Sequence, residues 1–127
     1  MIAVKRVYDP PHPGDGERYL VERLWPRGVR RNQLRVDGWL KDVAPSTGLR
    51  QWFSHDPAKW TEFRHRYARE LNAHPVVWQP ILEAAKGGKR VTLIFSSRAT
   101  EHNNAVALRD YLEGKLDAPR TKLRKTA

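Results

Sequence analysis

The sequence predicts a single α/β domain in which a mostly parallel β-sheet is flanked by helices. Strand patterns occur early and late in the chain, helical patterns lie between them, and the late strand at residues 91–95 is apolar on both faces. A strand that is apolar on both faces is typical of a parallel sheet covered by helices. The domain is expected to occupy residues 1–118, and residues 119–127 are expected to form a basic, flexible tail.

The first third of the chain is predicted to supply strands separated by turns. Residues 2–8 indicate a first strand, and the two prolines after Asp9 end it because they stop ladder pairing and helix alike. Residues 19–24 indicate a second strand, which a turn containing proline and glycine closes. Residues 34–43 fit neither the helical nor the strand period, and a short strand near Trp39 is favoured.

The centre of the chain is predicted to be helical. Ser46 is the expected N-cap of a short helix that runs through Phe53. Asp56 and Pro57 suit the N-cap and the first position of the next helix. The apolar stripe of this helix, with spacings of three and four, consists of Trp60, Phe63, Tyr67 and Leu71.

A third helix, a late strand and a last helix complete the pattern. The third helix is expected from near Pro80 to the glycine pair that follows Lys86. After the late strand the chain enters a polar loop and then a helical pattern that begins near His102. One face of this last helix carries Ala105, Leu108, Leu112 and Leu116.

Composition limits the class of protein. The formal net charge is +10, which predicts attraction to polyanions such as nucleic acid, although a solvated basic surface has the same composition. The chain has no cysteine, and its histidines match no metal-binding spacing, so no metal and no cofactor are expected. Dinucleotide, P-loop and serine-hydrolase motifs are absent from the sequence. Without a signal peptide or a membrane-spanning run, a cytoplasmic protein with no membrane partner is expected, and its oligomeric state stays open.

Loops that follow the strands are predicted to form one site. Parallel strands deliver such loops to the same edge of the sheet, and arginines beside hydroxyl groups and a helix start suit phosphate or carboxylate. We therefore expect the site to bind a phosphate-bearing ligand, a nucleotide or a nucleic-acid segment, with Arg27 and Arg98 as anion contacts. The expected ligand-binding residues are Arg23, Trp25, Arg27, Ser96, Ser97, Arg98 and Asn103.

Other interpretations of the same residues stay open. In a small enzyme acting on a nucleotide or nucleoside, His102 would be the general acid–base and Asp9 would orient it. In an interaction module, the tail would dock an acidic partner. The purely structural interpretation is that His102 and Asn103 cap the last helix, that Arg23 pairs with a nearby carboxylate, and that Trp25 packs in the core instead of stacking on a base.

Five phrases of the chain occur in a characteristic order: VYDPP at 7–11, LWPRG at 24–28, WLKD followed by APS at 39–46, WF followed by HDP at 52–57, and EHN at 101–103. With these phrases, residues 2–116 resemble the YeaO-like branch of the uncharacterised domain-of-unknown-function family 488.

The resemblance has three implications. Spacing alone leaves a hairpin or a parallel arrangement open for the first two strands, because residues 9–18 are short for a helical crossover. The longer branch of the family has a helix there, which implies a parallel pair. That branch also has a Cys–His pair after the late strand, where this chain has His102 and Asn103, so the resemblance argues against a nucleophilic thiol. YeaO-like chains often place an acid where this chain has Ala99, which argues against a carboxylate role there.

Overall fold

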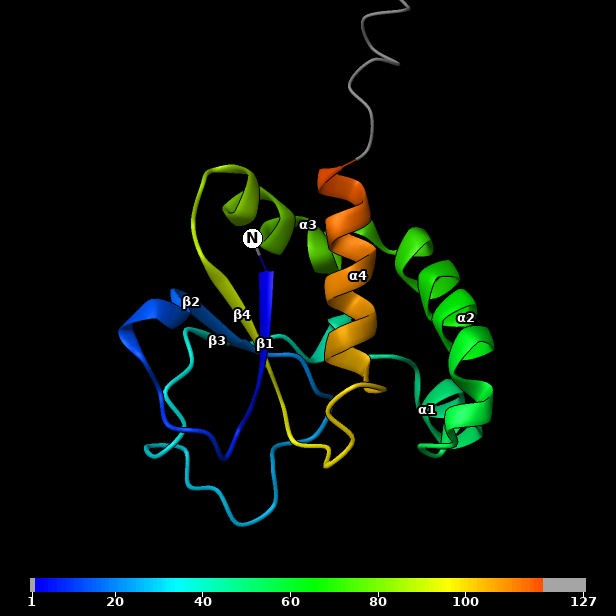
Figure 1. The fold of residues 1–127 in the computed structure, drawn as a ribbon, viewed down its shortest axis with the longest axis horizontal. Coiled ribbons are helices and arrows are strands. Elements are labelled where there is room, and N and C mark those ends of the chain that lie inside the picture. Colours follow the sequence, from blue (N-terminus) through cyan, green and yellow to red (C-terminus); the bar gives the residue numbers. More distant parts are fainter. Residues whose placement is uncertain (1, 118–127) are drawn as a thin grey trace, which may run out of the picture.

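A computed structural model describes residues 2–117 and confirms the α/β class (Figure 1). Its sheet has four parallel strands in the order β1-β4-β2-β3. The strands are β1 (Ile2–Arg6), β2 (Glu17–Leu20), β3 (Gly38–Trp39) and β4 (Val91–Phe95). The α-helices are α1 (Thr47–Phe53), α2 (Trp60–Ala73), α3 (Pro75–Lys86) and α4 (Asn104–Leu116). The tail predicted at residues 119–127 lies outside the described residues.

The late strand β4 occupies the centre of the sheet. Ile2 of β1 is in register with Val91, and Tyr19 of β2 is in register with Leu93. The first two strands therefore run in the same direction, which excludes the hairpin, but they are not neighbours as a parallel pair would be. All five residues of β4 are buried, as expected for a strand paired on both edges and covered on both faces. The connection from β1 to β2 contains a short 3-10 turn, Pro13–Asp15, in place of a helix.

The second strand is shorter than predicted. It ends at Leu20, and Val21 makes the next ladder hydrogen bond, from its N–H to the carbonyl of Ile94 at 3.2 Å. The chain then leaves the sheet and returns only at β3, whose position at Trp39 is confirmed. We call the connecting segment, residues 21–37, the arginine loop, because residues 23–35 contain five arginines and no acidic residue.

The helices begin where capping chemistry allows. Ser46 caps α1, as predicted, by accepting a hydrogen bond from the backbone N–H of Leu49 at 3.2 Å. Asp56 caps a separate 3-10 turn, Pro57–Lys59, and α2 follows that turn, so the single helix predicted there is divided. Helix α3 begins at Pro75 and contains Pro80, because Pro75 suits the first helical position and Pro80 lies on the exposed side.

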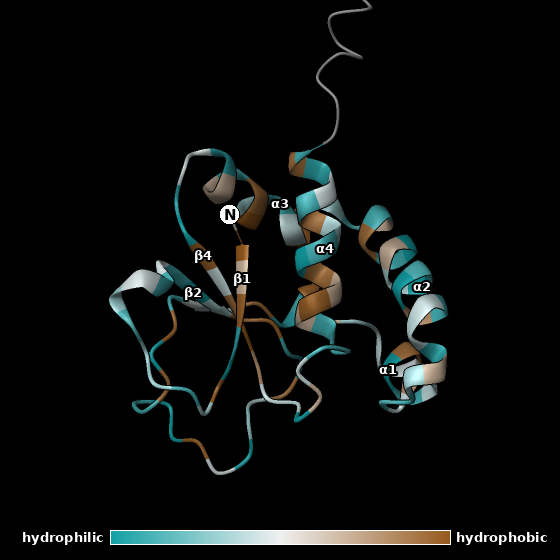
Figure 2. Cartoon of the chain, in the orientation of Figure 1, coloured by the Kyte–Doolittle hydropathy of each residue, from teal (hydrophilic) through white to brown (hydrophobic). Residues whose placement is uncertain are grey.

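The two faces of the sheet are covered differently. Apolar residues of all four helices pack with Val91, Leu93 and Phe95 in the main core, and Figure 2 shows hydrophobic residues along β1, β4 and parts of α3 and α4. The opposite face of β4 presents Ile94 to a smaller cluster that includes the buried Leu34 of the arginine loop. Helices thus flank one face, while the arginine loop covers the other and extends past the carboxyl ends of the strands (Figure 1).

Among residues 2–117, no helix combines the length and the apolar character needed to cross a membrane.

Candidate functional site

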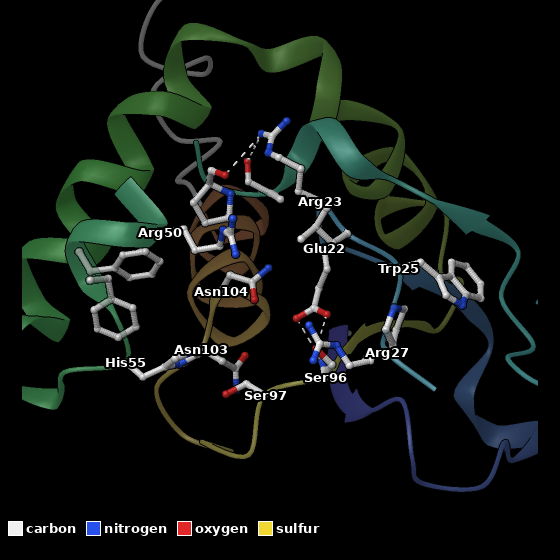
Figure 3. A pocket seen from close by; sticks show the side chains of 16 residues that line it. Glu22, Arg23, Trp25, Arg27, Arg50, His55, Ser96, Ser97, Asn103 and Asn104 are labelled. Atoms are coloured by element: carbon white, nitrogen blue, oxygen red, sulfur yellow. Dashed lines mark hydrogen bonds between the residues drawn. The ribbon is translucent and has the colours of Figure 1, made fainter. Parts of the chain in front are cut away.

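A cavity of about 300 Å³ lies where β2 and β4 end, next to the start of α4 and the end of α1 (Figure 3). Its position agrees with the edge of the sheet that the sequence predicted. Six predicted residues line it: Arg23, Trp25, Arg27, Ser96, Ser97 and Asn103. The other polar or charged residues of the lining, which the sequence interpretation missed as ligand contacts, are Glu22, Arg50, His55 and Asn104.

Three predicted residues do not line this cavity. Asp9 is exposed, and its carboxylate accepts a hydrogen bond from the backbone N–H of Arg6 at 3.3 Å. The ring of His102 lies 4.9 Å from the ring of Trp60. Within the described residues, no hydrogen bond joins His102 to Asp9, whose carboxylate is bound by the backbone of Arg6. Arg98 is exposed and stands outside the lining, so the cavity does not bring it together with Arg27.

Glu22 and Ser96 hold the loop after β4 against the end of β2. The hydroxyl of Ser96 donates a hydrogen bond to Oε1 of Glu22 at 2.5 Å, and its backbone N–H donates to Oε2 at 3.2 Å. The backbone carbonyl of Glu22 also accepts a hydrogen bond from Nε1 of Trp39 at 2.6 Å. Because both carboxylate oxygens of Glu22 and the hydroxyl proton of Ser96 are used in this contact, the pair positions the cavity wall.

Arg23 also has a positioning role. Its Nη2 donates to the carbonyls of Ala44 and Pro45 at 3.3 and 3.4 Å, as Figure 3 shows. The expectation that Arg23 pairs with a carboxylate is wrong, because no acidic group of residues 2–117 lies within salt-bridge distance. Its Nε is buried without a hydrogen-bond partner among the described residues.

Asn103 is the N-cap of α4. Its Oδ1 accepts from the backbone N–H of Val106 at 3.0 Å, and its Nδ2 donates to the carbonyl of Ala99 at 2.7 Å. The capping interpretation is therefore confirmed for Asn103. The neighbouring Asn104 donates from Nδ2 to the carbonyl of Val21 at 2.7 Å, which joins the start of α4 to the end of β2 and leaves its Oδ1 free to accept a hydrogen bond.

Arg27 and Arg50 are the available cations of the cavity. Within residues 2–117, neither guanidinium makes a hydrogen bond or an ion pair, and both residues are exposed. Figure 3 shows Arg50 extending from the region of α1, and Arg50 and Asn104 both line the cavity. Only Glu22 among the lining residues carries a negative charge, so the three lining arginines give the cavity a positive formal charge.

The backbone beside the cavity is in an uncommon conformation. Ser54 and His55 have φ angles of 46° and 58°, in the left-handed region that residues other than glycine rarely adopt. These residues end α1, and His55 lines the cavity with its ring 6.1 Å from that of Phe53. Strained backbone of this kind concentrates at binding and catalytic sites.

Trp25 packs mainly against the fold. Its ring meets that of Trp39 edge to face at 5.3 Å, and its Nε1 donates to the carbonyl of Val29 at 2.6 Å. The guanidinium of Arg31 lies 4.4 Å from the ring of Trp25 and 4.8 Å from that of Trp39. The residue thus has the structural role that the sequence left as an alternative, and it also lines one side of the cavity.

No group of three or more His, Asp or Glu side chains within residues 2–117 is arranged to hold a metal ion. The cavity instead offers two guanidinium groups that are unpaired within residues 2–117, and it adjoins the start of α4; both features favour anions.

The fold and the cavity define a small α/β protein with a basic pocket at the carboxyl ends of parallel strands. The chain belongs to the domain-of-unknown-function family 488, because residues 1–126 match a family described as the inactive DUF488-N3 subclade. It is 40% identical over 111 residues to the uncharacterised protein YeaO of Escherichia coli, with 87% of this chain and 96% of YeaO covered.

Uncharacterised proteins of Mycobacterium bovis and Mycobacterium tuberculosis are 39% identical to this chain over 114 residues, with 90% of this chain and 95% of each relative covered. The YeaO-like resemblance is therefore confirmed. No solved structure matches the chain significantly.

Proposed function

We propose that the protein binds a phosphate-bearing ligand, a nucleotide or the end of a nucleic acid, in the basic cavity. The observation that carries this proposal is the pair of unpaired guanidinium groups, Arg27 and Arg50, in a cavity beside the start of α4. A guanidinium group presents two parallel N–H donors that match phosphate oxygens, and helix N-termini favour negative charge.

The remaining walls suit the nucleoside part of such a ligand. Pro45, Phe53 and Phe63 provide an apolar side, while Ser97 and Asn104 can hydrogen-bond a sugar or a base. A volume of about 300 Å³ is at the lower end for small-molecule sites and suits one nucleotide rather than several. We further propose that the protein binds this ligand in the cytoplasm. Imaging of a fluorescently tagged chain in cells tests where the protein is located.

Binding is favoured over catalysis by the position of His102, which packs on Trp60 and not in the cavity. The description of the matched subclade as inactive agrees with a binding role. Incubating the protein with a panel of nucleotides and nucleosides tests the enzyme alternative. Turnover that His102→Ala abolishes would contradict the binding proposal, and absence of turnover agrees with it.

Titration calorimetry with adenosine monophosphate at low salt tests the proposal directly. Arg50→Gln should weaken binding by about 10- to 100-fold, because one charge-assisted hydrogen bond contributes roughly 1.5–3 kcal/mol. The matched control is Arg69→Gln, which removes the same charge from an exposed position of α2 outside the cavity. Arg98→Gln should resemble this control, contrary to the expectation from sequence alone. Absence of binding by the unaltered protein, or equal losses in Arg50→Gln and Arg69→Gln, would refute the proposal.

A further inference from the structure

We infer that the arginine loop continues the cavity as a binding track for single-stranded nucleic acid, with the terminal phosphorylated nucleotide of the strand held in the cavity. This inference rests on the proposed function and names the ligand class: a polymer rather than a free nucleotide.

The charge distribution of the arginine loop is the first reason. Residues 23–35 contain five arginines without an acidic residue, and the two acidic residues of the loop, Glu22 and Asp37, lie at either end of this run. Arg27, Arg30 and Arg35 are exposed, and their guanidinium groups make no hydrogen bond or ion pair within residues 2–117. Elsewhere, exposed arginines such as those of α2 pair with acidic neighbours. Unpaired cations along one segment suit a ligand with regularly spaced negative charges.

The loop is also held in place, so its cations have defined positions. Leu34 is 6% exposed and packs in the smaller cluster on the sheet. Arg31 lies over the rings of Trp25 and Trp39, which gives this arginine a packing role and leaves Arg30 and Arg35 as the cations open to a ligand. Because Trp25 and Arg27 line the cavity, the loop begins at the cavity wall.

An exposed aromatic ring lies beside the start of this track. Tyr8 is 54% exposed, its hydroxyl donates to the carbonyl of Arg27 at 3.5 Å, and the guanidinium of Arg6 lies 5.0 Å from its ring. A large exposed ring next to unpaired cations is the combination on which the bases of single strands stack.

The size of the cavity indicates a single strand rather than a duplex. A space that suits one nucleotide admits the end of a strand only if that nucleotide is unpaired. A base stacked on Tyr8 must also be free of its complementary strand.

Fluorescence anisotropy with a labelled thymidine oligonucleotide of about ten residues, carrying one terminal phosphate, tests the inference. The oligonucleotide should bind more tightly than thymidine monophosphate. In Arg30→Gln/Arg35→Gln, the slope of log affinity against log salt should fall in magnitude by about 1.4, since each lost contact to a single strand contributes about 0.7. Tyr8→Ala should weaken oligonucleotide binding by about tenfold through lost stacking. The loop variant should bind the mononucleotide as the unaltered protein does, because Arg30 and Arg35 lie outside the cavity lining.

The matched control is Arg64→Gln/Arg69→Gln, which removes two charges from α2 and should leave the salt slope nearly unchanged. Equal changes in the loop variant and this control would overturn the track, as would equal affinities for oligonucleotide and mononucleotide. Equal binding of a duplex, or equal competition by polyglutamate, would overturn the single-strand assignment. Failure of the mononucleotide itself to bind would instead overturn the proposed function.

Discussion

Asp15 is expected to stabilise the fold from a place remote from the cavity. Its carboxylate accepts hydrogen bonds from Nζ of Lys5 at 3.2 Å, from the backbone N–H of His12 at 3.0 Å and from Nη1 of Arg18 at 2.5 Å. The side chain of Arg18 is only 7% exposed, and its Nη2 already lacks a hydrogen-bond partner within residues 2–117. Asp15→Asn therefore leaves a buried guanidinium without its only carboxylate partner among these residues.

The expected cost follows from this burial. Removing one partner of a buried ion pair costs about 3–5 kcal/mol, and the lower end applies because asparagine keeps one oxygen that can accept a hydrogen bond. We expect a loss of about 3 kcal/mol in the free energy of unfolding at neutral pH. For a domain of this size, such a loss lowers Tm by roughly 10 °C.

The effect should depend on pH. Burial raises the pKa of Asp15, but the hydrogen bonds from His12, Lys5 and Arg18 outweigh it, so the pKa in the folded protein lies below its ordinary value of 3.8. The ionised carboxylate thus stabilises the fold fully above that ordinary value, and its contribution is lost as the pH falls through the lower, folded-state pKa. The difference in stability between the unaltered protein and Asp15→Asn should therefore shrink below about pH 4.

Urea denaturation followed by circular dichroism, at neutral pH and in a series of acidic buffers, measures both effects. The control is Asp9→Asn, because Asp9 is exposed and accepts a single hydrogen bond, so its loss should change stability by less than about 0.5 kcal/mol. The reasoning is refuted if the two variants are equally stable, or if the cost of Asp15→Asn stays constant on acidification.

Three further predictions concern other elements. Gly16→Ala should destabilise the protein by several kcal/mol in urea denaturation, because Gly16 has a φ of 69° and an added Cβ would collide with the backbone of the segment before β4; a near-neutral result would contradict this. Ser46→Ala should cost about 2 kcal/mol in urea denaturation, because it removes both the cap on the backbone N–H of Leu49 and the hydrogen bond that the Ser46 hydroxyl donates to Glu70. Ser46→Asn should restore the cap and recover about half of this loss. Burial and the hydrogen bond to Glu17 raise the pKa of Tyr19 to about 12. The protonated phenol of Tyr19 therefore stabilises the fold below pH 10, and this contribution is lost as the pH rises towards 12. Glu17→Gln should lower that pKa in an ultraviolet titration, and an unchanged titration would exclude the contact.

Several features of the fold followed from residues close together in the sequence. The strand at Val91–Phe95, the cap at Ser46 and the buried stripe of Phe63, Tyr67 and Leu71 all agree with their predictions. Each depends on apolar periodicity or on a side chain that reaches backbone only a few residues away. The same reasoning placed the start of the third helix too late. It expected the helix to begin near Pro80, but α3 begins at Pro75 and contains Pro80.

The site was predicted only in part. The loops after β2 and β4 meet as expected, since parallel strands end at one edge of the sheet. Arg50 was missed because α1 reaches the cavity through packing against other elements, and no local pattern marks its position. His55 belongs to the HDP phrase, but the sequence favoured a place for it in the turn before Asp56 rather than in a ligand site. The proposed Asp9–His102 pair required a distance that no spacing in the sequence specifies.

The amino-acid sequence by itself determined the α/β class, most of the strands and helices, and the edge of the sheet where the cavity lies, because these depend on local periodicity, capping and a general rule for parallel strands. Only the tertiary structure decided that β4 lies between β1 and β2, that the arginine loop covers one face of the sheet, and that Arg50 joins Arg27 in the cavity. Those features depend on which surfaces pack together across dozens of residues, and that choice minimises the free energy of the whole chain rather than of any segment.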